Sequence, residues 1–391
     1  MKHTLTTSIF KVGLLSMFMV MVSCSEDDNS MMPDDMGGND DDDEMVEGRR
    51  AELYVTNNDN GDITKFDITN DTQLTIGTSS TAAEGIYYDA SEDLVIQASR
   101  SNNWLESFDV TDLLDVDLSL DISFNGDADL ESPRELAVYG DYYVVADNGS
   151  NRFFVYQKTG TMFSLQTTVD VPFPVWGITF KGGDLYAVVD ISSDLAVYYN
   201  FLDKAMDGTM YPDKRVTIEG IVRTHGLTYS GSDDVMVMTD IGDAANTDDD
   251  GGFHIINDFS LKFDALSDGD VLTTDNQIRV AGSSTLMGNP IDVAYDSETD
   301  VVYVSDIGTS KVLGFSSIGS GGNIAPTFNV DLTAASSIYF SSDETDGDMG
   351  DSSEMGMTQL YTTSTANGNV VVYDLMNGTS KTIITGSATS E

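Results

Sequence analysis

Residues 53–68 of the chain read Leu53-Tyr-Val-Thr-Asn-Asn-Asp-Asn-Gly-Asp-Ile-Thr-Lys-Phe-Asp-Ile68. A short apolar run enters a polar Asn/Asp/Gly segment, and a second short run leaves it. Two apolar runs around turn-forming residues are typical of antiparallel strands joined by a tight connection. The stretch therefore predicts a β-hairpin.

The hairpin pattern recurs along the rest of the chain. Further copies begin at Leu94, Tyr142, Leu185, Val235, Val302 and Leu360. A more polar strand follows each hairpin, as at Gln73–Ile76. A short apolar strand precedes six of the seven hairpins, at Gly85–Tyr88, Glu135–Tyr139, Gly177–Phe180, Gly226–Tyr229, Asp292–Tyr295 and Ser337–Phe340. Four short strands in a period of roughly 40 to 65 residues are typical of a propeller blade.

The motif Tyr54-Val55-Thr56-Asn57 resembles the YVTN-type propeller repeat, and the other copies resemble it and the NHL-type blade. The resemblance implies an all-β fold with a single β-propeller over residues 50–391. Seven blades are expected, with six as the alternative if one hairpin is an insertion. The first blade lacks an inner strand of its own in the sequence. These families include lactonases, dehydrogenase subunits and proteins without known activity, so the resemblance implies a fold and not a function.

The N-terminus has the features of an export signal. Basic residues precede an apolar run, Val12–Val22, which is too short to span a bilayer as a stable helix. The run ends in Met21-Val22-Ser23-Cys24, which resembles a bacterial lipobox, with Met in place of the usual Leu. We therefore predict a lipoprotein signal peptide over residues 1–23 and lipidation of Cys24. The alternative is an ordinary secretory signal with a chance cysteine.

Residues 24–49 are acidic and of low complexity, so they predict a disordered tether. The cluster Ser25–Asp28 resembles the surface-export signal of Bacteroidota lipoproteins. This resemblance implies attachment to the outer membrane through the lipid, with the propeller facing the cell exterior. Several acyl chains on one cysteine would make that attachment stable.

The composition restricts the partners. Asp and Glu total 66 against 18 Lys and Arg, a formal net charge of −48. So negative a surface repels nucleic acid, which leaves a protein, a glycan or a small polar ligand as the expected partner. Cys24 is the only cysteine, so no disulfide can form within one chain. A monomer is the default expectation.

Chemistry-bearing side chains stand just before the inner strands, where a propeller's central channel opens. They are Glu84, Arg134, Trp176 and His225, with Glu135 and Asp292 one place further on. In lactonase-type propellers an acid, a His and an Arg occupy such a mouth. Arg134 would then hold an anionic group, and Glu84 or His225 would act as a base. The alternative is that Trp176 plugs the channel and His225 is a core residue.

Acidic residues also suggest metal binding. Asp248, Asp249 and Asp250 form part of an acidic loop that could hold Ca²⁺ through oxygen ligands, although the loop lacks EF-hand spacing. An Asp recurs at the end of the second strand of several repeats, at Asp147, Asp190, Asp240 and Asp306, with Asn57 equivalent. There a carboxylate accepts hydrogen bonds from the backbone amides of the turn that follows it, so these residues are expected to be structural.

Three functions remain open. The first is a surface-displayed binding or interaction module, favoured by the anchor, the tether and the lack of a strong catalytic motif. The second is an enzyme of lactonase or lyase type that uses the channel mouth. The third is a Ca²⁺-dependent adhesion domain. The sequence favours a protein that is not an enzyme without deciding the question.

Overall fold

The computed structural model describes residues 50–111, 113 and 118–342, and the backbone of three further strands. These are β28 (Gln359–Thr363), β29 (Val370–Asp374) and β30 (Thr379–Ile384). Cys24, the tether and the acidic insert at 343–357 lie outside the described residues. Residues 48–391 form one compact unit.

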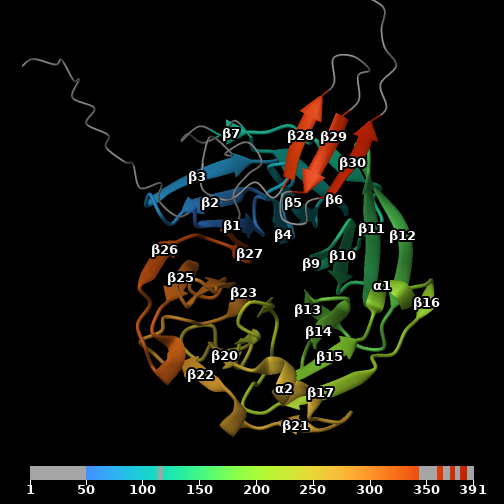
Figure 1. Ribbon diagram of the computed structural model, residues 1–391. Coiled ribbons are helices and arrows are strands. Elements are labelled where there is room, and N and C mark those ends of the chain that lie inside the picture. The colour runs from blue at the N-terminus through green and yellow to red at the C-terminus, as the bar shows by residue number, and fades with distance from the viewer. Residues whose placement is uncertain are drawn as a thin grey trace, which may run out of the picture. The chain divides into compact units, whose positions relative to one another are not determined.

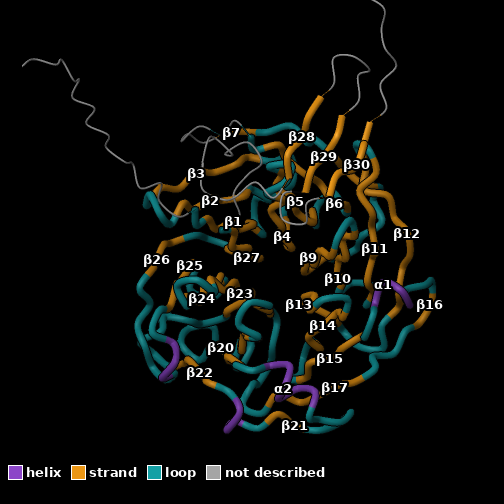
Figure 2. The backbone as a smooth tube through the Cα atoms, viewed as in Figure 1, coloured by secondary structure: helices purple, strands orange, loops and turns teal. Residues whose placement is uncertain are grey.

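Blades of four main antiparallel strands make up most of the described part of this unit, and the second and third blades are joined into one sheet (Figures 1 and 2). In each, the inner strand is written first. The first blade is β27 (Ala335–Ser341), β1 (Glu52–Asn57), β2 (Ile63–Asp67) and β3 (Thr72–Gly77). The second is β4 (Ala83–Asp89), β5 (Leu94–Ser99), β6 (Trp104–Asp109) and β8 (Phe124–Gly126), and the third is β9 (Pro133–Tyr139), β10 (Tyr142–Asp147), β11 (Arg152–Thr159) and β12 (Met162–Asp170).

The remaining blades have the same plan. The fourth is β13 (Val175–Lys181), β14 (Asp184–Val189), β15 (Asp194–Tyr198) and β17 (Lys214–Ile218). The fifth is β18 (Leu227–Ser230), β19 (Val235–Asp240), β20 (Gly252–Ile256) and β22 (Ile278–Ala281), and the sixth is β23 (Pro290–Asp296), β24 (Val301–Asp306), β25 (Lys311–Phe315) and β26 (Phe328–Asp331).

The inner strands form a closed ring. Each contacts the next in the order β27, β4, β9, β13, β18, β23 and back to β27. The predicted β-propeller is therefore confirmed, and the ring that the structure describes has six blades, the smaller of the two expected numbers. The seventh hairpin lies in a separate sheet of β28, β29 and β30.

The strand missing from the first blade comes from the far end of the ring. β27 pairs with β1 in antiparallel register, with Leu53 opposite Phe340 and Val55 opposite Ile338. The sequence had assigned this segment to the hairpin at Leu360. It instead completes the first blade, because the unpaired edge of β1 needs a partner for its backbone groups.

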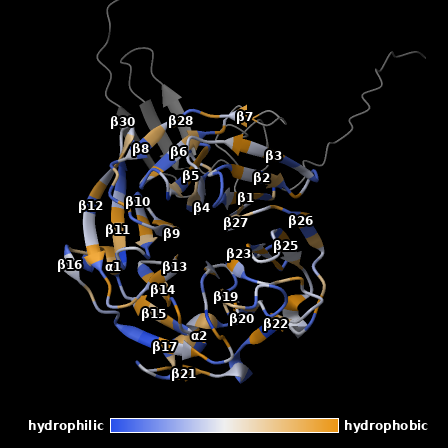
Figure 3. Cartoon of the chain, turned by 180° about the vertical axis from the view of Figure 1, so that it is seen from behind, coloured by the Kyte–Doolittle hydropathy of each residue, from blue (hydrophilic) through white to orange (hydrophobic). Residues whose placement is uncertain are grey.

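The hydrophobic core is divided among the spaces between blades. Each of six apolar clusters joins two neighbouring blades, and the cluster of Leu53, Val55, Ala294, Val312 and Ile338 joins the last blade to the first. Apolar residues alternate with polar ones along many strands (Figure 3). The second strands of the blades, such as β5 and β14, are instead apolar along most of their length, because both of their faces are buried against neighbouring blades.

Short elements cover the outer edges of several blades. The short strands β7 (Leu118–Ser119), β16 (Gly208–Thr209) and β21 (Val271–Leu272) pair in parallel with β3, β12 and β17. Each belongs to the blade that follows, so it protects the outer edge of the preceding one. The short helices are α1 (Phe201–Lys204), α2 (Phe259–Asp264), η1 (Thr274–Asn276) and η2 (Ile318–Ser320). No described helix is long and apolar enough to cross a membrane.

Candidate functional site

β-Bulges direct two of the side chains at the channel mouth. The strand register shifts where β4, β9, β13 and β23 begin, and Arg134 is the extra residue between Pro133 and Glu135. A bulge leaves one residue out of the ladder and turns its side chain in a new direction. Of the four predicted residues at the mouth, Arg134 and Trp176 lie in such a shifted segment. In β4 the extra residue is Gly85, next to Glu84, and the register of β18, which follows His225, is regular.

Glu84 is the most heavily bonded of them. Its carboxylate accepts hydrogen bonds from Arg134 Nη1 at 3.0 Å to both oxygens and from Asn58 Nδ2 at 2.8 Å. Arg100 Nη1 lies 3.2 Å from the same group. Glu84 is only 2% exposed. Burial raises the pKa of Glu84, and the two guanidinium groups oppose that shift.

Three flat groups stack beside this ion pair. The guanidinium carbon of Arg134 lies 4.1 Å from the centre of the Trp176 ring. The Trp176 and His225 rings are parallel within 4°, with centres 3.8 Å apart. Arg134 therefore gains a cation–π contact as well as its ion pair. We call Glu84, Arg134, Trp176 and His225 the mouth cluster; the sequence predicted this convergence, and the structure brings all four together.

A second ion pair ends the stack. His225 Nε2 lies 3.4 Å from Asp190 Oδ1, which also contacts Arg223 Nη2 at 2.7 Å. Burial lowers the pKa of His225 despite the nearby carboxylate, which favours the neutral imidazole at neutral pH. Burial opposes the ionisation of Asp190, but His225 and Arg223 keep its pKa below the usual range. The cluster is thus held by groups that bond one another.

The sequence missed Arg100, Arg223 and Asn58 at the mouth, and it assigned Asp190 to the recurring structural positions. Arg100 and Asn58 follow the second strands of their blades, and Arg223 lies two residues before His225. The repeat does carry a signal for these residues. In each blade, the turn after the second strand lies at the same end of the blade as the start of the inner strand. Only the blade-to-blade contacts show which of these turns reach the mouth.

Glu135 and Asp292 lie one layer deeper than the mouth cluster. Both are buried, and both line a cavity of about 220 Å³ in the central channel. The cavity is walled by residues of all six inner strands, including Tyr87, Phe180 and Tyr229. We call it the channel cavity. The two acids are thus not groups of the mouth itself.

The recurring Asp residues accept backbone hydrogen bonds from the turn that follows them, as predicted: Ser150 N–H donates to Asp147 at 2.9 Å, Gly242 N–H to Asp240 at 3.1 Å and Thr309 N–H to Asp306 at 2.8 Å. The same carboxylates also accept bonds from a second segment, which the sequence did not predict. Asp147 accepts backbone hydrogen bonds from Glu131 and Ser132 at 2.8 Å, and Asp306 accepts one from Gly288 at 2.8 Å. Asp240 does the same for Val222 at 2.9 Å. Each carboxylate holds the segment that enters the inner strand of its own blade.

The acidic loop uses its side chains on itself. Asp250 Oδ2 accepts a hydrogen bond from the Asp243 amide at 2.9 Å, and Asn246 Nδ2 lies 3.4 Å from Asp249 Oδ1. Asp248 donates its backbone N–H to Asn246. Within the described residues, no group of three or more His, Cys, Asp or Glu side chains is placed to hold a metal ion. The Ca²⁺ prediction therefore gains no support from the geometry.

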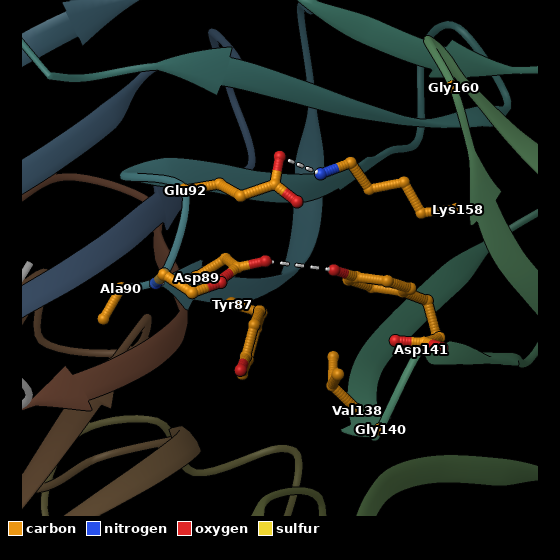
Figure 4. A pocket seen from close by; sticks show the side chains of 11 residues that line it. Tyr87, Asp89, Ala90, Glu92, Val138, Gly140, Asp141, Lys158 and Gly160 are labelled. Atoms are coloured by element: carbon orange, nitrogen blue, oxygen red, sulfur yellow. Dashed lines mark hydrogen bonds and ion pairs between the residues drawn. The ribbon is translucent and has the colours of Figure 1, made fainter. Parts of the chain in front are cut away.

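A larger hollow lies between the second and third blades, where the connection after β4 faces the ends of β9 and β11 (Figure 4). It measures about 660 Å³. Its walls are Tyr87, Asp89, Ala90, Ser91, Glu92, Val138, Gly140, Asp141, Tyr143, Lys158 and Gly160. We call it the side pocket. The sequence offered no signal for it, because its residues come from turns without a shared motif.

Comparison with known proteins supports the fold. A chain from a nidogen–laminin complex is 14% identical over 74% of this chain and 98% of its own length, with a TM-score of 0.51. The present protein, like the structures it resembles, is therefore a β-propeller. A putative 6-phosphogluconolactonase from Bacteroides fragilis is 9% identical over 75% of this chain and 98% of its own, with a TM-score of 0.52. One from Bacteroides uniformis is 8% identical over 75% and 100%, with a TM-score of 0.51. No protein-family model and no curated protein matches the chain.

Proposed function

We propose that this propeller is a binding module displayed on the cell surface, and that the side pocket holds its ligand. The observation that carries the proposal is the pocket itself, an open hollow of about 660 Å³ with polar walls. A ligand site is typically a concave hollow of roughly 300 to 1,000 Å³ with a few converging polar groups. The proposed ligand is a glycan or another small polar molecule.

The side pocket favours a ligand that donates hydrogen bonds. Lys158 contacts Glu92 at 2.5 Å and lies 4.6 Å from the centre of the Phe124 ring, so its charge is already balanced. Asp89 and Asp141 supply carboxylates, which can only accept when ionised. A molecule rich in hydroxyl groups would match them.

Aromatic rings form part of the same wall. Tyr143 is only 4% exposed, and its hydroxyl donates to Asp89 Oδ2 at 3.4 Å. Its ring meets that of Tyr87 edge to face, with centres 6.2 Å apart. Tyr87 is half-buried, so the apolar face of a sugar ring can lie against it while the sugar hydroxyls reach the acids.

The anchor and the location belong to the same proposal. Lipidated Cys24 would attach the chain to the outer membrane, and the acidic tether would hold the propeller away from it on the exterior side. The proposal takes the chain to be a monomer. Nucleic acid remains an unsuitable partner because of the charge of −48.

The alternative is an enzyme of lactonase type at the channel mouth. Two solved structures of similar fold carry the name putative 6-phosphogluconolactonase. Against this, Glu84 is engaged by Arg134, Arg100 and Asn58 and is not placed as a free base. His225 is 3% exposed beneath Trp176. The geometry therefore favours binding over catalysis.

A thermal-unfolding screen of residues 48–391 tests the site. The panel holds mono- and oligosaccharides, lactones and CaCl₂. We expect a saccharide to raise the midpoint, since a ligand at a hundredfold excess over its Kd stabilises the native state by about 2.7 kcal/mol. Replacing Asp89 and Asp141 together by Asn should weaken binding by tenfold or more, because each charged hydrogen bond contributes about 1.5–3 kcal/mol.

The control is Asp275→Asn, which removes an exposed carboxylate from η1, far from the pocket in the chain. It should leave the saccharide shift unchanged. If only a lactone raises the unfolding midpoint, and Glu84→Gln abolishes that increase, the ligand site is the mouth cluster and the enzyme alternative is favoured. If no saccharide in the panel raises the unfolding midpoint, the side-pocket proposal is wrong.

A further inference from the structure

Glu135 and Asp292 come from opposite sides of the ring. Glu135 lies on β9, whose neighbours are β4 and β13, and Asp292 lies on β23, whose neighbours are β18 and β27. The two strands are therefore three places apart in either direction around six blades. Even so, the two side chains hydrogen-bond to each other. Their contact crosses the axis of the propeller.

A hydrogen bond between two carboxyl groups requires a proton. An ionised carboxylate has acceptors only, so one member must remain protonated to donate. Asp292 already accepts the Ile338 amide at 2.9 Å, and Glu135 accepts the Leu136 amide at 2.9 Å. Both groups are at least nine-tenths buried. Two buried like charges in contact would be very costly, which favours the shared proton.

The surrounding charges agree with one proton. Glu84 is the nearest further acid, and Arg134 and Arg100 are its partners. Three carboxyl groups and two guanidinium groups therefore meet in this part of the channel. One shared proton makes the set neutral. His225, from the segment before β18, is kept neutral by burial.

The other titratable groups around the pair are phenols. They line the channel cavity from β4, β18, β23 and β27, as Tyr87, Tyr229, Tyr295 and Tyr339. Phenols ordinarily ionise near pH 10, and burial raises the pKa of Tyr229 and Tyr295 further. β13 contributes Trp176 and Thr179, which do not titrate, and at its end Lys181, whose Nζ lies 5.9 Å from the centre of the Tyr229 ring. The carboxyl pair is thus the group that changes charge nearest to neutral pH.

We propose that Glu135 and Asp292 form a proton-held latch, which joins opposite blades across the axis and separates the mouth cluster from the channel cavity. The latch is independent of the ligand proposed for the side pocket. While one proton is present, the latch is a charge-assisted hydrogen bond. When the last proton leaves, two carboxylates face each other and the contact becomes repulsive.

Infrared spectroscopy of residues 48–391 tests the proton directly. At pH 7, we expect a carbonyl band of a protonated carboxyl group that disappears in the double variant Glu135→Gln/Asp292→Asn. The matched control Asp141→Asn alters an exposed carboxylate and should keep the band. If the wild-type band is absent in buffer but appears after EDTA treatment, the pair holds a metal cation and the latch is refuted. A spectrum identical in wild type and double variant would also refute it.

The pH dependence of unfolding supplies a second test. Both acids ionise near pH 4 in an unfolded chain. In the folded protein, burial and mutual repulsion raise the pKa of Glu135 well above its usual range, and burial raises that of Asp292 to about 7. The folded state therefore retains protons that the unfolded state has lost, and stability falls as pH rises from about 5 to 7.

Glu135→Gln keeps a hydrogen-bond donor and removes this titration. Relative to that variant, the wild-type equilibrium constant for unfolding should rise by up to about tenfold per pH unit in the same interval. Parallel pH profiles for the two proteins would contradict a retained proton on Glu135. The comparison needs only the wild type and a near-isosteric variant, so it does not depend on the double variant folding.

Discussion

Ending the chain at Leu332 is expected to abolish folding, whereas ending it at Ser342 is expected to leave the ring intact. The two chains differ by β27, which pairs with β1 and contacts both β4 and β23. Without β27, the edge of β1 is unpaired and Ile338 no longer fills the cluster between the first and last blades. Such a loss approaches the whole stability of a domain, about 5–15 kcal/mol.

Urea unfolding followed by circular dichroism checks this result on chains that begin at residue 48 and end at 332, 342 or 391. We expect a cooperative transition for the two longer chains and none for the shortest. If the chain ending at 342 also fails to fold, the last hairpin is part of the closed unit, and the six-blade ring is incomplete as a description of the fold.

Gly177→Ala and Gly226→Ala are expected to be strongly destabilising. Both glycines are near the start of inner strands, where neighbouring blades approach most closely. A Cβ on Gly177 would overlap the carbonyl oxygen of His225, and one on Gly226 would lie 2.5 Å from the Cα of Asp292. Neither obstacle is the end of a flexible side chain, so the blades would have to move apart. Overpacking of this kind costs about 1–3 kcal/mol and sometimes more.

The matched control is Gly319→Ala in η2, where no atom lies within 4 Å of the added methyl group. Differential scanning calorimetry should show midpoints lower by about 1.5–4 °C for the first two variants and a change near zero for the control. Equal, small effects at all three positions would mean that the inner strands are not packed as closely as the ring requires.

The fold was largely predictable because each blade carries its own local signals. Alternating strands, Asn/Asp/Gly turns and a recurring Asp fix the blade, and the structure confirms the role of Asp147, Asp240 and Asp306. Closure was not predictable in the same way. The pairing of β1 with β27 joins residues nearly 290 positions apart, such as Glu52 and Ser341, and no local pattern specifies that partner.

The candidate sites also differ in whether local sequence signals or contacts between blades determine them. Glu84, Arg134, Trp176 and His225 occupy equivalent positions in successive blades, so their convergence followed from the repeat alone. The side pocket and the contact between Glu135 and Asp292 depend on which blades face each other. The order of the inner strands was the missing step, since the described ring of six puts β9 opposite β23.

The most direct test of the closed ring is a disulfide between β1 and β27. Glu52 and Ser341 are register partners, and Cα atoms of paired antiparallel strands lie about 4.5–5.5 Å apart, within reach of a disulfide. Residues 48–391 contain no other cysteine. Glu52→Cys with Ser341→Cys should therefore cross-link within one chain under mild oxidation, as mass spectrometry of proteolytic fragments would show. Glu52→Cys with Lys181→Cys, at the end of the opposite strand β13, should not. A folded Glu52/Ser341 variant that stays reduced would contradict the ring closure on which this account rests.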